Sequence, residues 1–128
     1  MTTWESGRES ALLDEIIAGR KTIEGRLKKG KFAQYQPGDI IKLRRDIRDE
    51  NGVLHDGQPD AVRVEVIAVR EYSSFLSLVE QEGFKKVIPM ASTVQEAANE
   101  YDKYYPAEDQ TKYGVLAIEI TVIEQGKV

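Results

Sequence analysis

The sequence predicts an α+β fold, namely a small, mostly antiparallel β-barrel with flanking helices. The expected elements follow the order helix, strand, strand, long loop, strand, helix, helix, strand. Too few helices separate these strands for a doubly wound parallel sheet. A length of 128 residues is typical of one domain, so we expect residues 1–128 to form a single domain around one hydrophobic core.

The N-terminal part of the chain predicts a helix followed by a strand. Residues 9–18, ESALLDEIIA, repeat apolar side chains at helical spacing, and Gly19 suits the end of a helix because glycine adopts left-handed conformations readily. Residues 21–27, KTIEGRL, alternate between two faces, which is typical of a strand. Glu24 and Arg26 then project from the same face.

The middle of the chain predicts two strands joined by a long polar connection. The turn sequence QPGD at residues 36–39 precedes an apolar strand at residues 40–44. Residues 48–60 contain an Asn-Gly and an Asp-Gly pair, so we expect a protruding hairpin loop. Residues 61–72 alternate apolar and charged side chains and form the clearest strand pattern in the sequence.

The C-terminal half predicts two helices and a closing strand. Residues 73–83 begin with serines suited to capping and end with glycine. Residues 92–105 carry a capping box, and Pro106 should stop this helix. Residues 113–125 alternate along their whole length and are expected to close the sheet.

Composition excludes several kinds of site. The chain has no cysteine and a single histidine, His55, which removes disulfides, thiolate nucleophiles and cysteine or paired-histidine metal sites. We therefore expect neither a metal site nor a cofactor. No apolar run approaches membrane-spanning length, and the polar N-terminus does not resemble a signal peptide, so we expect a cytoplasmic protein without membrane contact.

Charge is distributed unevenly along the chain. Residues 1–48 have 11 basic and 7 acidic side chains, a balance of +4, whereas residues 49–128 have 7 and 15, a balance of −8. The overall charge of −4 argues against broad binding to duplex nucleic acid. It leaves room for one basic cleft that accepts a short or single-stranded ligand.

The most basic stretch, GRKTIEGRLKKGK, runs from Gly19 to Lys31 and contains six basic residues and one acid. Within it, Gly19, Lys21, Glu24 and Arg26 form the pattern G-x-K-x-x-E-x-R. An ammonium, a carboxylate and a guanidinium group in one pocket can hold a phosphate or the polar edge of a base. The alternative is that Glu24 and Arg26 form a surface ion pair of little energetic value, beside solvated lysines.

This pattern, placed after a helix and before a "PGDIIKL" strand, resembles the ASCH family, which belongs to the PUA-like group of β-barrels. The segments "VRVEVIAVREYSSF", "YYP" and "KYGVLAIEI" extend the resemblance over nearly the whole chain. The resemblance implies RNA binding in a cleft lined by Lys21, Glu24 and Arg26. Some similar proteins are small amidohydrolases that cleave acetylcytidine with the motif lysine and a threonine at the position of Glu24. A carboxylate there cannot supply a hydroxyl nucleophile but can act as a general base on water.

Three functions follow as hypotheses. The first is an RNA- or nucleotide-binding domain whose cleft contains Lys21, Glu24 and Arg26, with Tyr72 and Tyr113 as stacking surfaces for bases. The second is a hydrolase acting on a modified nucleoside or on RNA, with Lys21 and Glu24 as its acid–base pair. The third is a protein-interaction module that uses the acidic C-terminal half.

Overall fold

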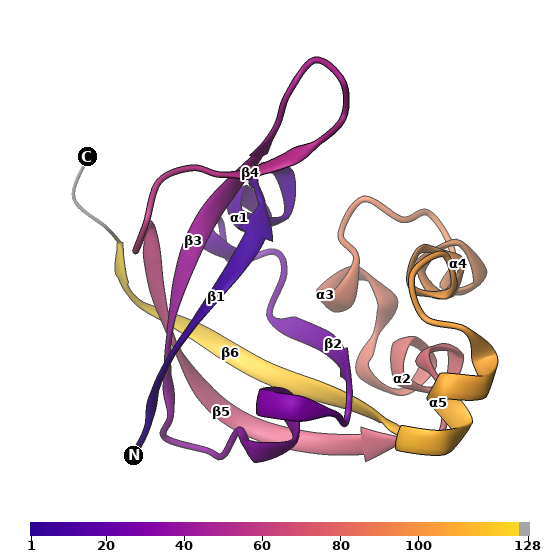
Figure 1. Ribbon diagram of the computed structural model, residues 1–128. Helices are drawn as coiled ribbons and strands as arrows, with labels where there is room; N and C mark the ends of the chain where they lie inside the picture. Colours follow the sequence, from indigo (N-terminus) through magenta and orange to yellow (C-terminus); the bar gives the residue numbers. More distant parts are fainter. Residues whose placement is uncertain (126–128) are drawn as a thin grey trace.

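A computed structural model describes residues 1–125 and has a mixed α+β architecture built on one curved sheet (Figure 1). Among these residues the sheet has six strands, in the order β1-β3-β5-β6-β2, with β4 beside β3. The pairs are antiparallel except for β1 with β3. The strands are β1 Thr3–Glu9, β2 Ile23–Leu27, β3 Ile40–Arg48, β4 Leu54–Asp56, β5 Val62–Tyr72 and β6 Val115–Gln125. The predicted α+β, mostly antiparallel class is confirmed, but within residues 1–125 the sheet is not closed, and β1 and β2 form its two edges.

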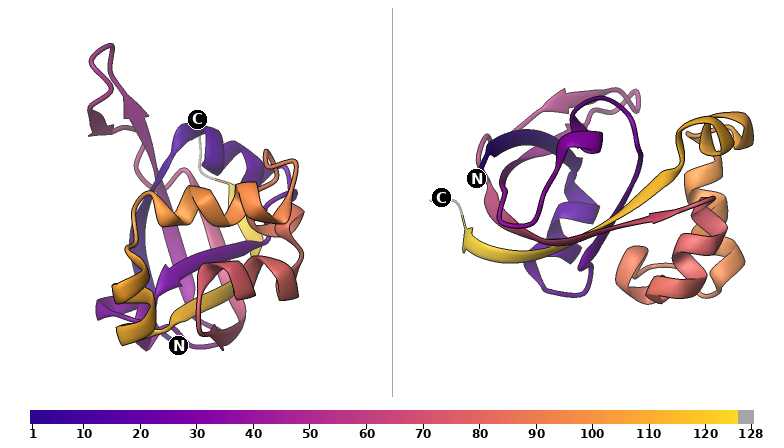
Figure 2. Two further views of the ribbon diagram at one scale, coloured as in Figure 1. Left: turned by 90° about the vertical axis from the view of Figure 1, so that its right-hand side faces the viewer. Right: turned by 90° about the horizontal axis from the view of Figure 1, so that it is seen from below.

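Most of the helices form a layer on one side of the sheet, where α2 and α4 lie side by side, whereas α1 lies at the other end (Figure 2). The helices are α1 Ser10–Ile17, α2 Phe75–Glu82, α3 Phe84–Val87, α4 Val94–Asp102 and α5 Ala107–Tyr113, and a 3₁₀ helix, η1, spans Gly30–Gln34. Two predicted caps are confirmed. The hydroxyl of Ser74 accepts a hydrogen bond from the amide of Ser77, and that of Thr93 accepts one from Glu96.

Two hydrophobic clusters form, one on each face of the sheet, where the sequence suggested a single core. Strand β6 contributes to both because its side chains alternate. Val115 and Ala117 pack against α2 and α4, and Leu116, Ile118 and Ile120 pack in the cluster that contains α1. A strand buried on both faces explains why residues 115–120 are almost continuously apolar.

Strand β1 is an element that the sequence did not predict. Its sequence, TWESGRE, is polar and lacks the apolar alternation of a typical strand. The strand pairs with β3 along its whole length, and Asp39, directly before β3, accepts hydrogen bonds from the indole nitrogen of Trp4 at 2.9 Å and the backbone amide of Thr2 at 3.0 Å. These contacts anchor the start of β1 beside β3, and Ser6 and Arg8 are buried in the resulting parallel pair.

The hairpin between β3 and β4 protrudes from the body of the molecule, as predicted for residues 48–60 (Figure 1). The helix expected over residues 92–105 ends earlier, at Asp102. Pro106 stands directly before a further helix, α5. A proline is tolerated there because the first N–H groups of a helix have no partner within the helix. No helix within residues 1–125 has both the length and the apolar character needed to cross a membrane.

Candidate functional site

A cavity of about 560 Å³ opens where the sheet fails to close, between its edge strands and the helical layer. Its walls come from segments far apart in the sequence. They include Arg8 of β1, Leu12 of α1, Arg26 of β2, Leu54 of the hairpin and Tyr101 of α4. A volume of this size suits a ligand of nucleotide dimensions.

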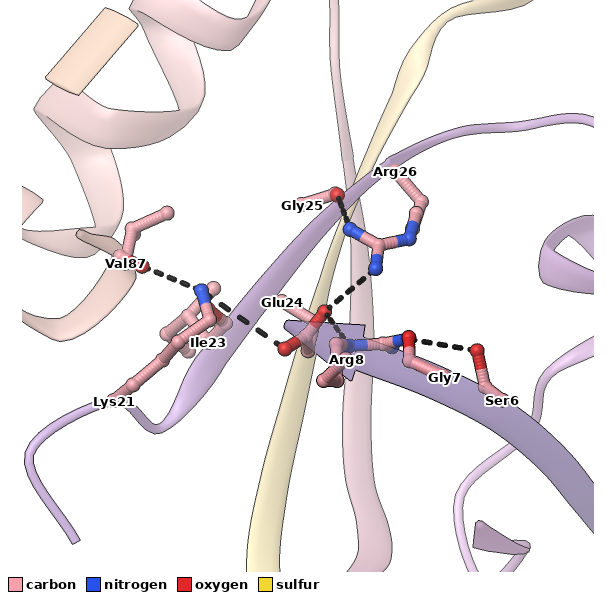
Figure 3. A network of polar contacts seen from close by, with 9 residues as sticks. All are labelled: Ser6, Gly7, Arg8, Lys21, Ile23, Glu24, Gly25, Arg26 and Val87. Atoms are coloured by element: carbon pink, nitrogen blue, oxygen red, sulfur yellow. Dashed lines mark hydrogen bonds and ion pairs between the residues drawn. The ribbon is translucent and has the colours of Figure 1, made fainter. Parts of the chain in front are cut away.

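Glu24 of β2 stands at the centre of the cavity floor, where three cations surround its carboxylate (Figure 3). Arg8 Nε donates to Glu24 Oε2 at 2.9 Å, and Arg26 Nη2 lies 3.3 Å from the same oxygen. Lys21 Nζ lies 4.0 Å from Oε1. The side chains of Arg8, Lys21 and Glu24 are only 4%, 3% and 2% exposed, so the alternative of a surface ion pair is wrong.

Backbone carbonyl groups fix the directions of the surrounding cations. Arg8 Nη1 donates to the hydroxyl of Ser6 at 2.7 Å and to the carbonyl of Gly7 at 2.6 Å. Arg26 Nη1 donates to the carbonyl of Gly25 at 2.7 Å. The guanidinium groups are therefore held by strand geometry as well as by the carboxylate.

Lys21 is fixed from two separate elements. Its Nζ donates to the carbonyl of Ile23 at 2.8 Å and to the carbonyl of Val87 at the end of α3. An ammonium group has three N–H donors, and these contacts use two of them. Glu24 Oε1 is buried and has no hydrogen-bond partner within residues 1–125. The floor thus carries an unused acceptor and an unused donor 4.0 Å apart, an arrangement that buried polar groups seldom show without a ligand or water.

The electrostatics of the floor move the pKa values of Glu24 and Lys21. Burial alone would raise the pKa of Glu24, but Arg8, Lys21 and Arg26 outweigh it and hold that pKa far below its ordinary range. The pKa of Lys21 is lowered to about 8, chiefly by burial; Glu24 opposes this change, and Arg26 and Arg8 contribute to it. At neutral pH the carboxylate is therefore ionised, and a fraction of Lys21 is neutral.

Tyrosines form the wall of the cavity on the helical side. Tyr101 is 7% exposed and stacks on Phe75 with ring centroids 4.3 Å apart. It also packs against Gly25, where an added Cβ would lie 2.8 Å from the Tyr101 ring. Tyr105 lines the same wall, and Tyr104 stands at the mouth with 67% of its surface exposed.

The structure brings Lys21, Glu24 and Arg26 together, but it places Tyr72 and Tyr113 elsewhere. These two tyrosines line a separate hollow of about 590 Å³. The hydroxyl of Tyr72 donates to Glu82, so this residue is engaged in the packing of α2 on β5. The expectation that Tyr72 and Tyr113 share a cleft with Lys21 is therefore wrong.

Arg8 is the site residue that sequence reasoning missed. The signal was weak, since it consisted of Ser6 and Arg8 on one face of a strand whose composition is polar. The contact with Glu24 also spans the two edges of the sheet, so no local pattern could reveal it. Among residues 1–125, no group of three or more histidine, aspartate or glutamate side chains is arranged to hold a metal ion.

Comparison with known proteins identifies the family. A family model described as the ASCH domain matches residues 10–124, and the chain belongs to the ASCH domain family. No protein with a curated description matches it.

Two solved structures are similar over nearly their whole lengths. The crystal structure of the hypothetical protein PH0355 is 38% identical, with a TM-score of 0.78, and the match covers 94% of this chain and 99% of that one. The solution NMR structure of protein PF0455 from Pyrococcus furiosus is 36% identical, with a TM-score of 0.74, covering 95% and 98%. The crystal structure of protein EF3133 from Enterococcus faecalis V583 has a TM-score of 0.58 at 16% identity, covers 98% and 77%, and shares the fold alone.

Proposed function

We propose that the chain binds RNA or a nucleotide-like ligand in the cavity between β1, β2 and α4. The observation that carries this proposal is that Glu24 Oε1 is buried without a hydrogen-bond partner within residues 1–125. Lys21 Nζ, which uses two of its three donors on backbone carbonyls, lies 4.0 Å from that oxygen. The polar edges of nucleobases offer acceptors and N–H donors side by side, which complements such a pair. Membership of the ASCH family supports the same ligand class.

Each floor residue has a role in this proposal. Lys21 donates to a carbonyl oxygen, and Glu24 accepts from a base N–H group while it orients Arg8 and Arg26. Arg26 is the more accessible cation, with 19% of its side chain exposed, and contacts a phosphate or a second carbonyl group. Tyr104 at the mouth provides a surface on which a base can stack.

The cavity is not strongly basic. Among its described lining residues, four basic side chains are balanced by four acidic ones, including Glu96 and Glu100 of α4. Phosphate attraction therefore supplies only part of the binding energy inside the cavity. We expect affinity for single-stranded RNA to be modest and to decrease with salt.

Titration of a labelled single-stranded RNA of about 8 nucleotides tests the proposal. Tyr104→Ala should weaken binding by about 1–3 kcal/mol, the range for loss of a stacked base. Arg26→Gln should weaken it by about 1–3 kcal/mol, through loss of a charge-assisted contact. The matched controls are Ile67→Ala and Arg63→Gln, exposed or partly exposed residues of β5 outside the cavity, and they should leave affinity unchanged. Equal affinities for all four variants would refute the proposal.

Hydrolysis of a modified nucleoside in the same cavity is the second candidate. The lowered pKa of Lys21, about 8, favours it because a partly neutral amine near neutral pH can transfer protons. The carboxylate of Glu24 is a weak base, since its pKa lies far below neutral. Proton transfer in this scheme therefore falls to Lys21, with Glu24 stabilising its charged form. Incubation with a panel of modified nucleosides tests this candidate, and product that forms with the wild type but not with Lys21→Met would support it.

A further inference from the structure

The segment that follows Arg26 forms a second feature, which the cavity does not explain. Residues 26–32, RLKKGKF, contain four cations and no acid in a chain whose net charge is −4. Together with Lys112 and Tyr113 of α5, they form what we call the basic–aromatic strip. We define it as Arg26, Lys28, Lys29, Lys31, Phe32, Lys112 and Tyr113.

The strip repeats one arrangement, an aromatic ring approached by two cations. Lys29 Nζ lies 5.0 Å and Lys112 Nζ 5.2 Å from the centre of the Tyr113 ring. The Arg26 guanidinium carbon lies 5.3 Å and Lys31 Nζ 5.5 Å from the centre of the Phe32 ring. All four distances fall within the range of cation–π attraction.

The two parts of the strip are continuous with each other and with the cavity. The amide of Lys28 donates to the carbonyl of Gly114 at 3.0 Å, which brings the end of β2 beside Tyr113. At the other end, Arg26 lines the cavity and approaches Phe32. Arg26 therefore links the cavity to Phe32, and the end of β2 links the same segment to Tyr113.

Positive charge on the strip is only partly compensated. Lys28 pairs with Glu71 at 2.8 Å, but no ion pair joins Lys29 or Lys112 to an acid within residues 1–125. Burial lowers the pKa of Lys31, and Arg8, Arg26 and Arg44 lower it further, so several cations share this region. Lys31 Nζ itself donates to the carbonyl of Glu5 at 2.6 Å.

We infer that the basic–aromatic strip is a contact surface for the single strand of RNA that flanks the nucleotide in the cavity. The lysines contact backbone phosphates, and the rings of Phe32 and Tyr113 stack on bases. This inference rests on the proposed function and extends it from one nucleotide to a strand. An acidic peptide would use the lysines but has no bases to stack on the two rings, so alternation of rings and cations favours single-stranded nucleic acid.

The test compares ligands of increasing length on the full chain. The probes are the four nucleoside monophosphates, which fit the cavity alone, and oligoribonucleotides of about 4, 8 and 12 nucleotides without self-complementarity. In the wild type, affinity should rise with length. The double variant Lys29→Gln/Lys112→Gln should keep its monophosphate affinity but lose most of that rise. Its salt slope should become shallower by about 1.4, because each phosphate contact on a single strand contributes about 0.7.

Two further variants separate the contributions. Tyr113→Leu should lower oligonucleotide affinity about fivefold or more without changing the salt slope, since it removes stacking but no charge. Lys85→Gln is the matched control: its Nζ lies 5.7 Å from the Phe84 ring, but it belongs to neither the strip nor the cavity. It should change nothing.

Three results would contradict the inference about the strip. If the length dependence and the salt slope are equal in the wild type and the double variant, the strip is not an RNA contact surface. Intact monophosphate binding in that case would preserve the proposed function. If a polyglutamate peptide binds the wild type as tightly as RNA does, and the double variant loses that binding, the assignment of the strip to nucleic acid would be overturned. Failure of every monophosphate and every RNA to bind would overturn both proposals.

Discussion

Replacement of Glu24 by glutamine tests the buried network directly. The carboxylate balances Arg8, Lys21 and Arg26, and both Arg8 and Glu24 are almost completely buried. Glutamine keeps the shape but not the charge, which leaves three cations without their shared counter-charge. Breaking a buried ion pair in this way costs about 3–5 kcal/mol. For a chain of this size, we expect the melting temperature to fall by roughly 10–20 °C.

The measurement is thermal and urea unfolding of Glu24→Gln beside a matched control. Glu71→Gln removes the acid of the Lys28–Glu71 pair, which has a similar short distance of 2.8 Å but is half exposed. That control should lose less than about 1 kcal/mol because exposed pairs contribute little. Adding Arg8→Met to Glu24→Gln should recover part of the loss, since it removes one of the three cations that the variant leaves unbalanced.

Dependence on pH provides an independent check of the same residue. The pKa of Glu24 is lower in the folded chain than its ordinary value of 4.5, so its contribution to stability is present above that value and is lost as pH falls. Glu24→Gln should therefore show a flatter acid limb in a plot of stability against pH. A variant within about 1 kcal/mol of the wild type, with an unchanged acid limb, would refute the argument for a stabilising buried network.

Three other predictions concern single contacts. Gly25→Ala should cost about 1–3 kcal/mol in urea unfolding, because the new Cβ would lie 2.8 Å from the Tyr101 ring; an unchanged midpoint would contradict this. Lys21 has a folded pKa of about 8 against 10.5, so stability should rise with pH across that interval, and Lys21→Met should remove the rise. Asp39→Ala should cost about 2–3 kcal/mol and speed amide exchange in β1, because it removes the acceptor of Trp4; slow exchange there would show that backbone pairing alone holds the strand.

Local sequence patterns determined several elements correctly. The alternation in β5 and β6, the Asn-Gly hairpin and the serine and threonine caps depend on neighbouring residues alone, so their physical causes are visible in the sequence. The spacing of Glu24 and Arg26 likewise placed both side chains on one face of β2, because side chains of a strand alternate. The ASCH family followed from the same motif and is confirmed by the match over residues 10–124.

Features that depend on contacts between distant segments of the chain were decided by the tertiary structure. Strand β1 is polar and depends on Asp39, more than thirty residues away, so its own sequence carried no strand signal. Whether Glu24 formed a weak surface pair or a buried network depended on desolvation, which only the packing of β1, β2 and α4 against one another determines. Tyr72 and Tyr113 have the right chemistry for a ligand site, but they stand at the ends of β5 and α5, which places both of them beside a different hollow. Residue type and periodicity thus specified the parts of the site, whereas contacts between distant segments specified its composition and charge balance.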